Sequence, residues 1–451
     1  MELEGRLLAA AAEDDVKRKE KGDLLLWRRS GFRAVPALEH AAYRATPWEV
    51  LHTLARAVAV SQRGAGRGLA EHWACLKYTQ AIADADGFLK LTAEGRASTS
   101  RNYKSLQSEE LGTGLALTSA RRLLQAQHPG YMVSFTPADV VLRAGFALLA
   151  EDRADKYNPR KRKPDAVGRR FPHFYFAELW QPGRPSLVTV ISTRAHHGRS
   201  SASHGQLLSA AVHTARLQVG PWDQVPALLV STAFPPKAPV RVHLLQAQGN
   251  GGSLAASSRG ETRLDHEARQ RNLITILEPP AEQQQRPGIE ELTAGCHIYD
   301  TSREWFQQVL GRTAAAGLGA FAGHDATTHR FLVPRQRAER YAEYAHAATQ
   351  SVHDASHELQ GRTFVGTDHV FRLNHIRIEA FSGVDSDLFD DLSHGRIEQY
   401  RHKVYRQRHT SQLVFWDDEK WNGPVSIDAD GTVLAIHVVD VRNAPRRRQR
   451  A

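Results

Sequence analysis

Five histidines fall within one stretch of the sequence, at His173, His196, His197, His204 and His213. Imidazole nitrogens favour zinc, nickel or copper over magnesium, so a transition-metal site is one chemistry open to this stretch. Metal ligands must converge in space, which spacing within a loop does not establish, and the chain has 23 histidines in all. A serine–histidine hydrolase is not indicated either, because no G-x-S-x-G motif surrounds Ser192. We therefore predict no metal site and no nucleophilic serine.

Basic side chains cluster in two places. The first cluster runs from Lys156 to Arg170 and contains Arg160, Lys161, Arg162, Lys163, Arg169 and Arg170. The second is the tail from Arg446 to Arg450. A net charge of +10 and a pI of about 9.7 fit a polyanionic partner, although the arginine and alanine content also fits the coding bias of a GC-rich genome. We expect the first cluster and Arg194 to contact nucleic-acid phosphates, with a solvated loop as the alternative, and the tail to be a disordered basic end.

The elements that must position these residues follow from apolar spacing. Residues 174–177 and 187–193 are β-rich runs that flank a Pro-Gly turn, which predicts an antiparallel hairpin. Residues 206–217 have helical spacing, and residues 227–232 form a short apolar run typical of a buried strand. Upstream, Ser108 could cap a helix that extends through Gln125, with an acidic pair in its first turn. Strand, strand, helix, strand predicts a compact α/β core.

This order resembles the core of the PD-(D/E)xK nuclease superfamily, the restriction-endonuclease-like fold. In that family an acidic residue, often after a proline, begins the first hairpin strand, and an E-x-K or D-x-K triplet ends the second. In this sequence His173 follows Pro172 at the first position, and Ser192 and Arg194 occupy the outer positions of the triplet.

Two further positions carry the same resemblance. Gln206 stands where the family often has a glutamine on the next helix, and Glu109 and Glu110 stand where it often has a supporting glutamate. The stretch around this acidic pair also resembles uncharacterised actinobacterial proteins with such a core. The resemblance implies a mixed sheet flanked by helices, here with an N-terminal helical extension and a C-terminal α/β domain.

The family's chemistry depends on carboxylates that hold Mg²⁺, and on a lysine that stabilises charge or orients water. A neutral imidazole at His173 and a hydroxyl at Ser192 supply no negative charge, and Arg194 is too basic to exchange a proton at neutral pH. A competing alignment uses Asp165 after Pro164, which restores one acid and leaves the triplet unchanged. We expect no confident catalytic residue and no resident cofactor; Mg²⁺ would be needed only if a displaced acidic site were active.

Length, composition and cysteine content indicate the general class of protein. At 451 residues, 41% hydrophobic and 24% charged, the chain is long enough for two or three domains of ordinary composition. No apolar run approaches the roughly 18 residues of a membrane span, no signal-peptide pattern begins the chain, and Cys75 and Cys296 are too far apart in sequence to indicate a disulfide framework. We expect a cytoplasmic protein without a membrane partner.

The expected organisation has five parts. These are a helical N-terminal region (1–100), the restriction-endonuclease-like core (101–247), flexible loops with one strand (248–288), a C-terminal α/β domain (289–444) and the basic tail (445–451). Within them, residues 73–83 and 335–359 are predicted helices, and residues 272–277 a predicted strand.

Three functions remain open at this point. The first is a nucleic-acid-binding pseudoenzyme on a nuclease-like core, which we favour. The second is an active Mg²⁺-dependent DNA endonuclease with a displaced site of Glu109 or Glu110, Asp165 and Glu178. The third is a scaffold for assembly with protein partners.

Overall fold

The structure is a computed structural model of the chain. It describes residues 32–35, 45–60, 71–85, 87–97, 100–144, 173–198, 200–214, 217–219, 225–249, 251–254, 296–298, 302–333, 336, 352–373, 376–408, 413–415, 421 and 423–439. The basic cluster up to Arg170, Asp165, the expected strand 272–277 and the basic tail therefore lie outside the described residues.

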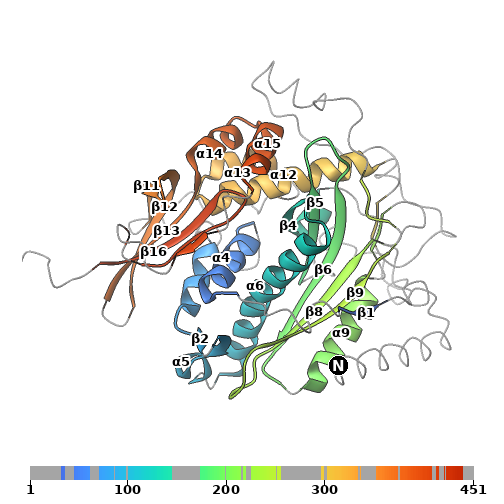
Figure 1. The fold of residues 1–451 in the computed structure, drawn as a ribbon, viewed down its shortest axis with the longest axis vertical. Helices are drawn as coiled ribbons and strands as arrows, with labels where there is room; N and C mark the ends of the chain where they lie inside the picture. Colours follow the sequence, from blue (N-terminus) through green and yellow to red (C-terminus); the bar gives the residue numbers. More distant parts are fainter. Residues whose placement is uncertain are drawn as a thin grey trace, which may run out of the picture.

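A six-stranded mixed sheet forms the first half of the fold (Figure 1). Its strand order is β1-β9-β8-β6-β5-β4, with β6 and β8 parallel and the other neighbours antiparallel. The strands are β1 (Arg33–Ala34), β4 (Met132–Pro137), β5 (Phe174–Trp180), β6 (Leu187–His196), β8 (Ala227–Ala233) and β9 (Arg241–Ala247). The hairpin expected from the Pro-Gly turn is confirmed as β5 and β6, in which Phe174 pairs with Ser192.

Two helices cover opposite faces of this sheet. The 27-residue helix α6 (Arg101–Gln127) packs along β6 and β8 on one face. Helix α9 (Ser200–Thr214) connects β6 to the parallel strand β8 across the other face. A parallel pair requires such a crossover, because a tight turn can join only antiparallel strands.

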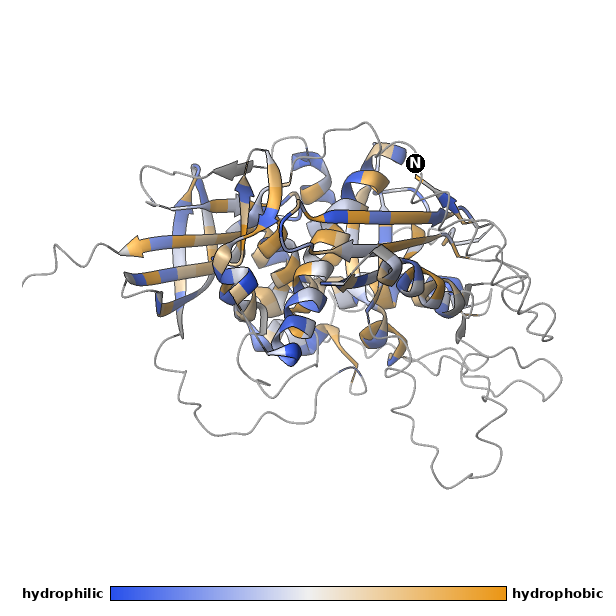
Figure 2. Cartoon of the chain, turned by 90° about the horizontal axis from the view of Figure 1, so that it is seen from below, coloured by the Kyte–Doolittle hydropathy of each residue, from blue (hydrophilic) through white to orange (hydrophobic). Residues whose placement is uncertain are grey.

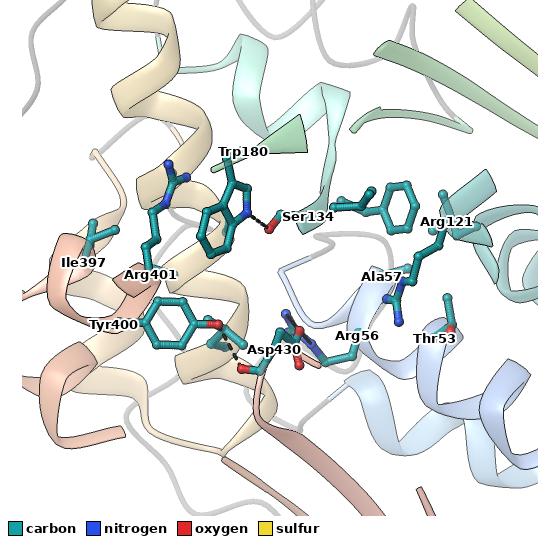
Figure 3. A pocket seen from close by; sticks show the side chains of 17 residues that line it. Thr53, Arg56, Ala57, Arg121, Ser134, Trp180, Ile397, Tyr400, Arg401 and Asp430 are labelled. Carbon is teal, nitrogen blue, oxygen red and sulfur yellow. Dashed lines mark hydrogen bonds and ion pairs between the residues drawn. The ribbon is translucent and has the colours of Figure 1, made fainter. Parts of the chain in front are cut away.

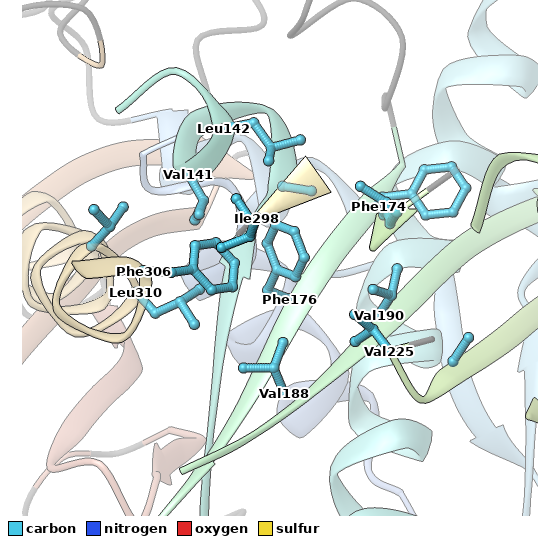
Figure 4. Close-up of a cluster of buried hydrophobic side chains, with 14 of the residues drawn as sticks. Val141, Leu142, Phe174, Phe176, Val188, Val190, Val225, Ile298, Phe306 and Leu310 are labelled. Atoms are coloured by element: carbon cyan, nitrogen blue, oxygen red, sulfur yellow. The ribbon is translucent and has the colours of Figure 1, made fainter. Parts of the chain in front are cut away.

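The two faces of the β5–β6 hairpin carry different residues, because side chains alternate along a strand. Phe174, Phe176, Val188 and Val190 pack with α9 in one buried apolar cluster. The cluster also contains Phe306 and Leu310 of α12 (Arg303–Phe321) and residues of α7 (Ala138–Leu142) (Figure 4). Tyr175, Ala177, Leu179 and Ile191 pack instead with the α6 face. Burying each large apolar side chain stabilises the fold by about 1.5–3 kcal/mol. The positions of these side chains therefore determine which face of the hairpin packs against which helix.

The described part of the N-terminal region contains strands as well as helices. Helix α4 (Pro47–Val58) begins as expected: the side chain of Thr46 accepts a hydrogen bond from the backbone N–H of Glu49 at 3.1 Å, and Pro47 lies at the first helical position. The predicted helix 73–83 is wrong. A 3₁₀ helix (Glu71–Tyr78) leads instead into a hairpin of β2 (Ile82–Ala85) and β3 (Phe88–Leu91). Gly87, with φ +77° in the hairpin turn, allows this reversal. The short helix α5 (Ala93–Ala97) precedes α6.

A second sheet of six strands is entirely antiparallel, with order β11-β12-β13-β16-β15-β14. Its strands are β11 (Val352–Leu359), β12 (Arg362–Leu373), β13 (Ile376–Asp385), β14 (Leu413–Phe415), β15 (Val425–Ile427) and β16 (Thr432–Val439). Helices α13 (Asp325–Phe331), α14 (Ser386–Ser393) and α15 (Ile397–Gln407) complete this half. The predicted helix 335–359 is wrong over 352–359, because register with β12 makes these residues an edge strand.

The strands and helices of both halves carry polar as well as apolar residues (Figure 2), and β8 is a largely apolar, fully buried strand. Helix α4 lies against both sheets, and the indole Nε1 of Trp48 donates to the backbone oxygen of Leu434 in β16 at 2.9 Å. A two-stranded parallel pair of β7 (Leu217–Val219) and β10 (Cys296–Ile298) forms a separate small sheet, whose Leu217 and Ile298 pack in the same apolar cluster as the β5–β6 hairpin. The described chain is thus mixed α/β, with one mixed sheet flanked by helices and one separate antiparallel sheet. No helix in the described ranges has both the length and the apolar character needed to cross a membrane.

Candidate functional site

Glu109 and His173 come together at the start of β5. Nδ1 of His173 lies 3.1 Å from Oε1 of Glu109, which is on α6. The two residues are 64 positions apart in the sequence, and the packing of α6 against the hairpin joins them. The side chain of Glu109 is 39% exposed and that of His173 is 17% exposed, so the pair lies at an accessible edge of the fold.

Hydroxyl groups complete this site. Thr113 lies one helical turn beyond Glu109, and its Oγ1 is 3.3 Å from Oγ1 of Thr193 in β6. The backbone oxygen of His173 accepts bonds from the amide of Thr193 at 2.8 Å and from its hydroxyl at 3.2 Å. We refer to Glu109, Thr113, His173 and Thr193 as the α6-face site.

The backbone of His173 is itself unusual, with φ +68°. In the described residues the other non-glycine with positive φ is Gln360, which sits in the tight turn between β11 and β12. A non-glycine residue in this region costs on the order of 1–3 kcal/mol, and such strain is often found at functional sites. The two bonds from Thr193 to the backbone oxygen hold His173 in place.

Ser192 and Arg194 lie on the other face of the sheet. Thr193 faces α6, so its neighbours in the strand face α9 by alternation. Ser192 is completely buried, pairs with Phe174, and its Oγ has no hydrogen-bond partner among the described residues. The positions matched to the nuclease triplet therefore do not converge with Glu109 and His173. The residue that does is Thr193, between them.

Both ends of the side-chain amide of Gln206 form hydrogen bonds to strands of the first sheet. Its Nε2 donates to the backbone oxygen of Ala195 at 2.8 Å, and its Oε1 accepts from the Oγ of Ser231 at 2.8 Å. These bonds connect α9 to the carboxyl ends of β6 and β8, which accounts for both ends of the amide.

Glu110 and Glu178, the other acidic candidates, lie away from the α6-face site. Glu110 accepts a 2.5 Å hydrogen bond from Tyr78 and pairs with Lys77 at 2.6 Å. Burial, together with the hydrogen bond to Glu110, raises the pKa of Tyr78. Glu178 is 1% exposed and pairs with Arg401 at 2.7 Å, and it accepts a bond from Ser186 at 2.9 Å. It lies five residues along β5 from His173, roughly 17 Å away. The displaced acidic site thus has no second described carboxylate beside Glu109.

His196 contacts Ser203 but is not placed to act as its general base. Nδ1 of His196 accepts from the amide of Gly198 at 3.0 Å, so the neutral ring carries its proton on Nε2 and donates it to Ser203 Oγ at 2.8 Å. Burial lowers the pKa of His196. A histidine that donates to a serine cannot accept that serine's proton, which excludes His196 as a general base for Ser203.

The other histidines also fail to converge on a metal. His243 in β9 lies near His196 and His204, and burial, followed by these neighbours and Arg241, lowers its pKa to about 4. His213 bonds the backbone oxygen of Ser209 within its own helix at 2.7 Å. Within the described ranges, no three His, Cys, Asp or Glu side chains are placed to hold a metal ion.

A separate cavity of about 40 Å³ lies between the two sheets (Figure 3). Three arginines line it, and each is paired with a carboxylate: Arg56 with Asp430, Arg121 with Asp428, and Arg401 with Glu178. The volume suits about one or two water molecules. Because these charges balance, we interpret the cavity as a buried ionic junction between the two halves of the fold.

Comparison with known proteins found no matching family model, no matching curated protein and no matching solved structure.

Proposed function

We propose that this chain is a nucleic-acid-binding protein built on a nuclease-like core, without the standard metal-dependent phosphodiesterase activity. The element order α6, β5, β6, α9, β8 supports the nuclease-like core, because a helix followed by an antiparallel hairpin, a crossover helix and a parallel strand agrees with the strand, strand, helix, strand order on which the sequence resemblance rests. The family assignment is part of the proposal.

The contact between His173 and Glu109 carries the proposal. In the nuclease scheme this position gathers carboxylates around Mg²⁺, a hard cation that prefers several oxygen ligands. Here one carboxylate meets an imidazole and two hydroxyls. This set has too little negative charge to hold Mg²⁺ by the usual mechanism, so the fold would keep its binding surface without its hydrolytic centre.

The distribution of charge supports a polyanionic partner. Arg169 and Arg170 lie a few residues before the start of β5 in the sequence, and Arg160, Lys161, Arg162 and Lys163 come shortly before them. Arg194 lies near the end of β6, two residues before the strand terminates. Phosphate contacts by such residues give salt-dependent, sequence-independent affinity.

Binding and cleavage assays separate the three functions. The full chain is titrated into labelled single-stranded DNA, duplex DNA and RNA between about 50 and 300 mM salt, and is incubated with plasmid in Mg²⁺ or Mn²⁺. We expect salt-dependent binding and an intact plasmid. Cleavage of the plasmid that is lost in Asp165→Asn would support the active nuclease instead. If the chain binds no nucleic acid even at about 50 mM salt, assembly with protein partners is the function that remains.

A charge-matched pair of variants tests the surface. Arg160→Gln/Arg162→Gln/Lys163→Gln and Arg446→Gln/Arg447→Gln/Arg448→Gln each remove three positive charges. The first should weaken binding to all sequences and reduce the salt slope by about 0.9 per lost duplex phosphate contact, whereas the second should change little. Equal effects of the two variants would mean that net charge, and not a surface at residues 160–163, accounts for the binding.

A further inference from the structure

Three large apolar side chains are exposed within 19 residues of the chain. In the described part of the molecule, Phe88 is 58% exposed, Tyr103 36% and Leu106 43%. Phe88 begins β3 beside the hairpin turn, and the other two lie in the first turns of α6. Exposed single apolar residues are ordinary, but a group of them beside a candidate site indicates a contact surface.

Two members of this group, Tyr103 and Leu106, lie on the same helix as Glu109 and Thr113 of the α6-face site. Leu106, Glu109 and Thr113 follow each other at the i, i+3 and i+7 spacing that places residues on one helix face. Leu106 is therefore about 4.5 Å along the helix axis from Glu109, and Tyr103 about 9 Å, both on the solvent side.

The β2–β3 hairpin is attached at the same end of α6. Nε2 of Gln107 donates to the backbone oxygen of Gly95 in α5 at 3.1 Å, and the amide of Val240 donates to the backbone oxygen of Leu89 at 2.9 Å. The second bond ties the hairpin to the connection between β8 and β9. Figure 1 shows β2 and α5 beside the beginning of α6.

The charges around this group have both signs, because Asp84 lies in β2 and Glu94 in α5, whereas the start of α6 is basic. Arg101 and Lys104 occupy the first turn of α6, which contains no acidic residue. Cations at this end of a helix interact unfavourably with the helix dipole, so helix stability does not explain them. Lys104 also lies near His197, which directly follows β6, and helps burial to lower the pKa of that histidine.

We infer that Phe88, Tyr103 and Leu106 form a stacking surface for single-stranded nucleic acid, which Arg101 and Lys104 hold by its phosphates. Exposed aromatic rings bind unpaired bases through their faces, and interleaved cations follow the backbone. In a duplex the bases already stack on each other, so their faces cannot reach these rings. The inference rests on the proposed function and adds the strandedness of the partner.

The test compares a 20-nucleotide oligo-dT with a duplex of the same length, both at one salt concentration. In the full-length chain, Phe88→Ala and Tyr103→Ala should each weaken oligo-dT binding by about ten-fold, because a base–aromatic stack contributes on the order of 1–3 kcal/mol. Duplex affinity should change by less than about two-fold. Tyr103→Phe keeps the ring and should bind as the parent does. Arg377→Gln, at an exposed position on β13 in the second sheet, is a control for substitution at a distant surface and should bind both probes as the parent does.

The outcomes distinguish the two proposals. If the parent binds no nucleic acid, the proposed function fails. If the parent binds but Phe88→Ala and Tyr103→Ala leave oligo-dT affinity unchanged, or lower single-strand and duplex affinity equally, the stacking surface is refuted and the proposed function stands. A change of mass in solution in Leu106→Ala, without a change in affinity, would identify the group as a contact between copies and also refute it. Thermal melts confirm that each variant is folded.

Discussion

Nδ1 of His173 lies 3.1 Å from Oε1 of Glu109 at the edge where α6 meets the β5–β6 hairpin. The imidazole occupies the place that a second carboxylate would need for a divalent cation site. One substitution therefore tests the interpretation of the whole site.

His173→Asp should create a weak site for Mn²⁺, because two carboxylates would then face each other across this gap. Aspartate tolerates the left-handed backbone at this position better than most residues do. Isothermal titration should detect Mn²⁺ binding in the variant, and Mn²⁺ should raise its melting temperature. His173→Asn, which has the same shape and no charge, is the control. Equal Mn²⁺ binding by the parent chain would contradict our account of the site.

The buried ion pair between Glu178 and Arg401 should contribute to folding and not to chemistry. Their side chains are 1% and 11% exposed. Glu178→Gln leaves the arginine without its buried counter-charge and should lower the free energy of unfolding by about 3–5 kcal/mol, measured with urea. Glu178→Gln combined with Arg401→Met removes both charges and should recover part of this loss. A Glu178→Gln variant of unchanged stability would show that the pair is not buried as described.

Two glycines provide a packing test with an internal control. A Cβ on Gly112 of α6 would overlap the Cβ of Ala195 in β6, whereas a Cβ on Gly205 of α9 has open space. Alanine is favoured over glycine in a helix by about 0.8–1 kcal/mol, but overpacking costs about 1–3 kcal/mol. Gly205→Ala should therefore stabilise the chain and Gly112→Ala should destabilise it. If both variants were stabilised in chemical denaturation, the close approach of α6 to β6 would be incorrect.

Stability should fall with acid through His52 and His243. Burial lowers the pKa of each to about 4, for His52 against the opposing effect of Asp428 and Asp430. The unfolded chain takes up protons near pH 6.5 and the folded chain only near pH 4. The free energy of unfolding should therefore decrease between these values, by up to about 1.4 kcal/mol per pH unit for each histidine.

His52→Gln tests how much His52 contributes to this pH dependence of stability. His52 lies 2.9 Å from Ser426 Oγ through Nδ1 and 3.1 Å from Thr432 Oγ1 through Nε2, so the variant should be less stable at pH 7. Its stability should also depend less steeply on pH between 6.5 and 4 than that of the parent. Parallel pH profiles for the two proteins would mean that His52 is not buried in its neutral form.

The sequence by itself determined the local elements of the core. Alternation and a Pro-Gly turn specify the β5–β6 hairpin, and Thr46 with Pro47 specifies the start of α4, because each depends on residues close together in the chain. Helical spacing specifies α9 only in part, since the helix expected at 206–217 begins at Ser200 and ends at Thr214, and Leu217 begins β7. The same local signals mislead at residues 82–83 and 352–359, where pairing between strands outweighs helical spacing. They also mislead at Ser108, because α6 begins at Arg101 with Ser100 as its cap, and the expected cap and its acidic pair lie inside the helix.

Only the tertiary structure decided which side chains meet. Alternation divides β6 into two faces, but the packing of α6 makes Thr193, and not Ser192, the neighbour of Thr113. Glu109 and Glu110 are adjacent in the sequence, yet helical rotation turns one to His173 and the other to Tyr78 and Lys77. Nothing in the sequence indicates a partner for Glu178, whereas in the structure Arg401 of α15 forms an ion pair with it. These assignments depend on contacts between distant segments, which buried apolar area establishes and local spacing does not encode.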